Sequence, residues 1–140
     1  MRKINLEQIP DLVIGRLLLK GWVIRSVNIS HDLHSHLCLW LSLSLAPDER
    51  QAKLPLLLPA IGHSTAEFFA DYPELKRLVI RAEAWSWHLP DQSRYFYISN
   101  EDLVDWKYNS RSDELLVASF REYESDPFRE SLSRPWRSWV

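Results

Sequence analysis

Residues 36–46, His36-Leu37-Cys38-Leu39-Trp40-Leu41-Ser42-Leu43-Ser44-Leu45-Ala46, carry the strongest structural signal in this chain. Every second residue from Leu37 to Leu45 is a leucine, and most residues between them are small or polar. Successive side chains alternate between the two faces of a β-strand, whereas an α-helix repeats every 3.6 residues. This alternation, sustained along the whole stretch, therefore predicts a β-strand with one apolar face.

The segments around this strand predict the rest of a sheet. Residues 22–30 also alternate, and residues 31–35 would form the hairpin loop that joins them to the leucine strand. Further along the chain the expected elements are a strand over 75–88, a turn at Pro90-Asp91, a strand over 93–99 and a last strand over 115–123.

Two helices are expected to cover this sheet. The first spans residues 10–20, with a proline in its first turn and Gly21 directly after its end. The second is short and spans residues 65–72, since the capping box that begins at Ser64 precedes it and a proline follows it. Residues 47–61 contain three prolines and are expected to form an irregular segment that buries its leucines.

These elements predict an α+β fold, with an antiparallel sheet of about five strands packed against an N-terminal helix and a short central helix. We expect residues 1–124 to form a single domain and residues 125–140 to be a tail that packs on the domain or on a partner. A parallel βαβ arrangement is the weaker alternative, because strands and helices do not alternate regularly along the chain.

Composition excludes several classes of protein. The chain has 140 residues, a formal net charge of −2, seven tryptophans and three glycines, which fits one globular domain and argues against phosphate neutralisation as its main task. Cys38 is the single cysteine, so neither an internal disulfide nor a cysteine-based zinc site can form. Because we find no signal peptide and no apolar stretch long enough to span a bilayer, we expect a cytoplasmic protein.

The hairpin over residues 75–99 offers the main candidate surface. Counting outward from its predicted turn places the following residues on one face: Arg77, Arg81, Trp85, Trp87, Arg94, Phe96 and Ile98. The opposite face would hold the core residues Leu78, Ile80 and Ala82 against Tyr95 and Tyr97. Tryptophan and arginine are enriched at protein-binding hot spots, and they also stack on and pair with single-stranded nucleic acid. Internal or dimer packing is the structural alternative.

A histidine-rich stretch lies in the predicted loop between the strand over residues 22–30 and the leucine strand. If it were extended, Asp32, His34 and His36 would share one face and could ligate a transition metal. The alternative is a polar hairpin loop, which would scatter these side chains.

The C-terminal tail contains Trp136 and Trp139 between arginines. These tryptophans either pack back on the domain, closing an edge of the sheet, or dock into a partner.

No motif for nucleophilic catalysis or phosphate binding occurs, and we expect no cofactor. Cys38 lies within a leucine-rich strand, where we expect a buried and inert thiol. The sequence therefore favours a small cytoplasmic, non-enzymatic protein-binding domain of the adaptor, chaperone-like or inhibitor/immunity type that uses a Trp/Arg surface, with a homo-oligomer as one form of that binding. A metal-binding module or metal-dependent enzyme at Asp32, His34 and His36 is the alternative, and single-stranded nucleic-acid binding is a further, disfavoured one.

Overall fold

The computed structural model describes residues 4–44, 50–83, 94–110, 112–124 and 127–128. Their helices are α1 (Ile9–Leu19), α2 (Arg50–Asp71), α3 (Asn100–Asp105) and α4 (Asp113–Ser119), with a short turn η1 (Leu6–Gln8) before α1 and a π-helical turn η2 (Trp106–Ser110) after α3. Their strands are β1 (Ser26–His31), β2 (Leu37–Ser44), β3 (Arg77–Glu83), β4 (Arg94–Ser99) and β5 (Arg121–Glu122). The fold is α+β, as the sequence predicted.

The five strands form one sheet in the order β1-β2-β3-β4-β5. Every neighbouring pair is antiparallel except β2 and β3, which run parallel. A parallel pair needs a long crossover connection, and here α2 supplies it. The weaker alternative, a βαβ unit, is therefore present once within a mostly antiparallel sheet.

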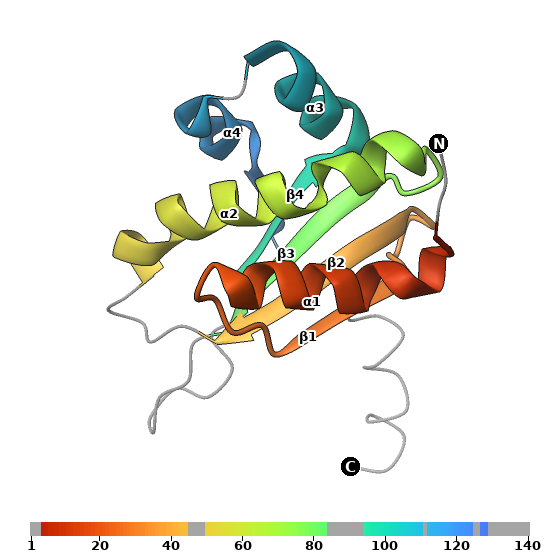
Figure 1. Cartoon of the computed structure of the whole chain (residues 1–140), viewed down its shortest axis with the longest axis horizontal. Coiled ribbons are helices and arrows are strands. Elements are labelled where there is room, and N and C mark those ends of the chain that lie inside the picture. The colour runs from red at the N-terminus through yellow and green to blue at the C-terminus, as the bar shows by residue number, and fades with distance from the viewer. Residues whose placement is uncertain (1–3, 45–49, 84–93, 111, 125–126, 129–140) are drawn as a thin grey trace.

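The leucine face of β2 lies at the centre of the core. The strand prediction is confirmed, and the first strand of the hairpin is confirmed from Ser26 onward. Leu39, Leu41 and Leu43 are at most 2% exposed, and they lie beside Leu78, Ile80 and Ala82 of β3. Figure 1 shows α1 and α2 lying across the same side of the sheet. One face of the sheet thus packs on helices, and no helix of the described residues covers the other face.

Residues 50–71 form one 22-residue helix, α2, where the sequence predicted an irregular segment and a short helix. That prediction was wrong because it treated Pro55 and Pro59 as breaks. Each proline removes one helical hydrogen bond and costs about 3 kcal/mol in a helix interior. The buried apolar side chains of the helix offset this cost, since each contributes about 1.5–3 kcal/mol; they are Leu54, Leu57, Leu58, Ile61, Phe68 and Phe69. No helix in the described residues is both long and apolar enough to cross a membrane.

The predicted last strand over residues 115–123 was also wrong. Its first part is α4, which the side chain of Ser112 caps by accepting the N–H of Leu115, and only Arg121–Glu122 form a strand. The serine followed by two acidic residues is a helix-start signal. The alternation of apolar residues after it concealed that signal.

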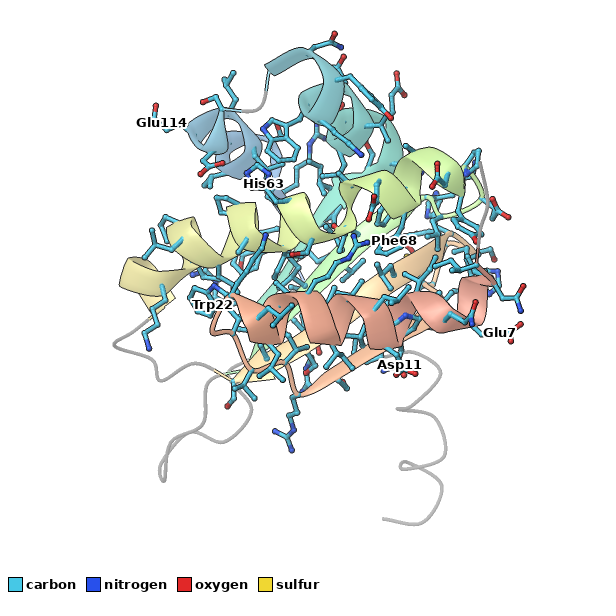
Figure 2. The ribbon with its side chains drawn as sticks, in the orientation of Figure 1. Glu7, Asp11, Trp22, His63, Phe68 and Glu114 are labelled. Carbon is cyan, nitrogen blue, oxygen red and sulfur yellow. The ribbon has the colours of Figure 1, made fainter. Side chains whose placement is uncertain are left out.

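α2 holds the helical layer together. Phe68 lies between α1 and α2 (Figure 2), and the guanidinium of Arg16 sits 4.5 Å from the centre of its ring. On the side of α2 that faces α3 and α4, Nε2 of His63 lies 3.0 Å from Oδ1 of Asp113 (Figure 2). The ring of His63 also meets Trp106 edge to face at 4.8 Å. These two contacts of His63 hold η2 and α4 against α2.

Two helical glycines provide a matched test of this packing. A Cβ added at Gly15 of α1 meets no atom within 4 Å, so Gly15→Ala is expected to raise the free energy of unfolding by about 0.5–1 kcal/mol through helix propensity. A Cβ at Gly62 of α2 overlaps Cδ2 of the buried Leu116, so Gly62→Ala is expected to lower it by about 1 kcal/mol. Urea denaturation measures both. Equal gains at the two positions would show that α4 does not pack closely on α2.

Candidate functional site

The face of the sheet without described helices carries two arginines and several rings. We call it the arginine face and define it by Cys38, Trp40, Ser42, Arg77, Val79, Arg81, Tyr95 and Tyr97, which the strand registers place on one side. The ring of Phe128 packs against Trp40 at 5.0 Å, and the N–H of Leu33 donates to the carbonyl of Pro127. The last described residues of the chain therefore lie at this face.

Arg77 is held in place by two tyrosine rings. Its guanidinium carbon lies 4.6 Å from the centre of the Tyr97 ring and 5.9 Å from that of Tyr123, and Nη1 donates to the Tyr123 hydroxyl at 2.9 Å. The two rings themselves pack at 4.4 Å. Burial raises the pKa of Tyr123 to about 12, so its phenol stays neutral at physiological pH. The arginine side chain is thus fixed by cation–π contact and one hydrogen bond, with 23% of it exposed.

Arg81, four residues further along β3, lies beside one tyrosine ring. It pairs in register with Tyr95 of β4, and its guanidinium carbon lies 5.8 Å from the centre of that ring. Arg77 and Arg81 therefore share one face, as the sequence predicted.

Arg94 does not belong to this face, so that part of the predicted surface was wrong. It pairs with Ala82 and lies on the opposite side of the sheet, where it makes a two-point contact with the carboxylate of Glu122 at 2.8 and 2.5 Å. Phe96 and Ile98 also face the helices, beside Ile80 and Leu78.

The error came from the register of the hairpin. Counting outward from Pro90-Asp91 pairs Trp87 with Arg94, whereas Ala82 is the observed partner of Arg94. A register that differs by an odd number of residues exchanges the two faces of one strand. The tyrosines of β4, predicted to lie in the core, consequently meet the arginines instead.

Asp32 organises the loop between β1 and β2. Its Oδ1 accepts the backbone N–H groups of His34 and His36, each at 2.9 Å, and the turn is completed by Ser35 in the left-handed region with φ 64°. Its Oδ2 lies 3.2 Å from Nδ1 of His36 and 3.9 Å from Nη1 of Arg77. Burial by itself would raise the pKa of Asp32, but the two N–H donors and His36 outweigh it and hold this pKa below its ordinary value.

This loop geometry brings together only part of the predicted metal site. Asp32 and His36 meet, while the ring of His34 lies 6.3 Å from that of His36. Within the described ranges no three His, Cys, Asp or Glu residues are placed to hold a metal ion. The carboxylate of Asp32 instead accepts backbone N–H groups of its own loop. This arrangement corresponds to the polar hairpin loop, the alternative to a metal site.

Cys38 is buried, as expected. It is 0% exposed, and its Sγ donates to the carbonyl of His36 at 3.3 Å. Burial raises the pKa of its thiol to about 12. Because the thiolate is the reactive form of cysteine, this residue is inert at neutral pH.

The tryptophans divide into two groups. Trp22 and Trp40 are partly buried, and Trp106 is 4% exposed with its Nε1–H donating to the carbonyl of Ser112 at 2.9 Å. The four tryptophans of the predicted partner surface lie outside the described residues, and their role stays a prediction; they are Trp85, Trp87, Trp136 and Trp139.

Comparison with known proteins found no family model, curated protein or solved structure that matches this chain. The candidate site therefore rests on its own geometry. Sequence reasoning missed Tyr97 and Tyr123 as partners of Arg77, since residues so far apart along the chain leave no local pattern.

Proposed function

We propose that this chain is a small cytoplasmic, non-enzymatic protein-binding domain, of the adaptor, chaperone-like or inhibitor/immunity type, that contacts its partner through the arginine face. The observation that carries this proposal is the pair Arg77 and Arg81, each set beside tyrosine rings on the face without described helices. Arginine and tyrosine are the residues most enriched, with tryptophan, at binding hot spots. Arginines already held in place also lose little conformational entropy on binding.

The tryptophans predicted from the sequence extend this proposal. Trp85 and Trp87 continue the odd-numbered positions of β3 that carry Arg77 and Arg81, so the same strand pattern would place them on the same face. The tail with Trp136 and Trp139 follows Phe128, which packs on that face. We therefore expect the tail and a partner protein to contact this same arginine face.

A second copy of this chain is one form that the partner could take. The end of α1 exposes three apolar side chains: Leu18 is 59% exposed, Leu19 is 90% exposed and Val23, just after the helix, is 79% exposed. Clustered exposed apolar residues are typical of protein interfaces.

Single-stranded nucleic acid is the second candidate ligand. Arginines beside aromatic rings on a sheet surface are the elements that stack bases and contact phosphates. The net charge of −2 argues against it, because nucleic-acid binding by phosphate contacts favours a basic surface.

The test compares Arg81→Ser with Arg94→Ser, two arginines from opposite faces of the sheet. The full chain and both variants are used to capture proteins from a native lysate, and the captured proteins are quantified by mass spectrometry. We expect Arg81→Ser to reduce the captured partners by about tenfold, and Arg94→Ser to retain them. Light scattering of the pure protein shows whether the partner is a second copy.

Two outcomes contradict the proposal. One is that the wild type enriches no protein over an unrelated bait and remains monomeric. The other is equal capture by Arg81→Ser and the wild type, with both variants folded by circular dichroism. Titration with a single-stranded oligonucleotide at low salt then decides the second candidate, since binding there quenches tryptophan fluorescence.

A further inference from the structure

A cavity of about 770 Å³ opens where the sheet meets α3. Residues from four parts of the chain line it, among them His36, Lys76, Arg77, Asn100, Val104 and Tyr108. Cavities that bind small molecules usually measure about 300–1,000 Å³. A smaller cavity of about 240 Å³ also has Arg77 in its lining.

Two of the basic side chains at this cavity are positioned by one buried carboxylate. The Asp32 side chain is 0% exposed, and its Oδ2 lies 3.2 Å from Nδ1 of His36 and 3.9 Å from Nη1 of Arg77. Engaging Nδ1 of the histidine directs its other ring nitrogen away from Asp32. The two rings beside Arg77 fix the plane of its guanidinium.

These groups retain hydrogen-bonding capacity that the described residues do not use. With the described residues Arg77 makes one hydrogen bond, to Tyr123, among its five possible N–H donations. Neither Nε2 of His36 nor the ammonium of Lys76 has a hydrogen bond or ion pair with any described residue. Lys76 and Arg77 donate from separate directions, and Nε2 of His36, whose Nδ1–H faces the Asp32 carboxylate, adds a third donor when the ring is an imidazolium. Donors in this arrangement suit a tetrahedral phosphate better than a planar carboxylate.

The α3 side of the cavity has a different character. It contributes the carboxylates of Glu101 and Asp105, together with Asn109 and the Tyr108 ring from η2. Carboxylates accept hydrogen bonds and repel a second anionic group. This side suits an organic portion that carries hydroxyl groups.

We propose that this cavity binds a small phosphate monoester with a hydroxylated organic portion, and that Lys76, Arg77 and His36 contact the phosphate. The proposal does not depend on a protein partner: Arg77 belongs to both the arginine face and the cavity, whereas Lys76 and His36 lie outside the arginine face and are the residues that the test below changes.

Nuclear magnetic resonance titration of the full ¹⁵N-labelled chain tests this site. The probes are glucose 6-phosphate, inorganic phosphate, glucose and succinate. We expect glucose 6-phosphate to give saturable shifts at amides of residues 36, 76–77 and 100–105. Lys76→Met and His36→Gln are each expected to weaken its binding by about tenfold, the effect of losing one charge-assisted hydrogen bond. The matched control Lys20→Met, at the exposed end of α1, should change it by less than about twofold.

The opposite results overturn the proposal. Absence of saturable shifts from glucose 6-phosphate up to about 10 mM would show that no site of useful affinity exists. If Lys76→Met and Lys20→Met weakened binding equally, glucose 6-phosphate would bind outside this cavity. If succinate bound as tightly as glucose 6-phosphate, the site would not prefer phosphate over carboxylate. If inorganic phosphate bound as tightly as glucose 6-phosphate, the organic portion would contribute nothing to binding, and that part of the proposal would be wrong.

Discussion

Leu57→Ala is expected to lower the free energy of unfolding by about 3 kcal/mol. Leu57 is 0% exposed and belongs to the core that α2 forms with the sheet. Truncating a buried leucine loses its transfer free energy and leaves a cavity, which together cost about 2–5 kcal/mol. Guanidinium chloride denaturation, followed by circular dichroism, measures the change.

The neighbouring residue supplies the control for this experiment. Leu56 is 66% exposed, so Leu56→Ala is expected to change stability by less than about 0.5 kcal/mol. The comparison separates a helix from the irregular segment that the sequence predicted, in which both leucines would be buried. Similar losses at the two positions would contradict the helical assignment of this part of α2.

Asp32→Ala is expected to lower the free energy of unfolding by about 2 kcal/mol. The change leaves the N–H groups of His34 and His36 without their acceptor and removes the negative charge beside Arg77. Hydrogen bonds to charged groups contribute about 1.5–3 kcal/mol each, less where water can replace the lost partner. Asp32→Asn is the matched variant: it keeps an oxygen acceptor, so we expect it to lose about half as much.

The contribution of Asp32 is also expected to depend on pH. Its pKa is lower in the folded protein than its ordinary value of 3.8, so the unfolded chain binds the proton more tightly. The stabilisation is fully present above the unfolded pKa and is lost as pH falls through the lower, folded pKa.

Denaturation of the wild type and Asp32→Asn from neutral pH to below pH 3 measures this dependence. We expect the stability of the two proteins to converge at the acid end. A constant difference across the whole range would show that the charge of Asp32 contributes nothing.

Local patterns predicted the fold wherever one physical effect dominated. The alternation in β2 was sufficient because this strand is an inner strand of the sheet, between β1 and β3, with one face on the helices. The pattern failed at α2, where the local preference of Pro55 and Pro59 opposes burial of Leu54 before them and of Leu57 and Leu58 between them. Tertiary packing determines which of the two effects prevails, and helix propensity alone does not include the free energy of that packing.

The candidate site was less predictable from sequence. Arg77 and Arg81 were placed on one face by alternation within a single strand, but Arg94 required the register between two strands. The link from Asp32 to Arg77, and from Arg77 to Tyr123, joins three distant segments. Only the folded arrangement brings them together.

The parallel pairing of β2 with β3 has a consequence for the order in which the chain folds. β1 and β2 are joined by a short loop, so their hairpin closes at little entropic cost. The β2–β3 ladder requires the chain to close a long connection, which costs conformational entropy. The favourable free energy of pairing offsets this cost only when α2 packs against both strands. We therefore infer that docking of α2 and assembly of the parallel ladder are one cooperative event, and that this event limits the rate of folding.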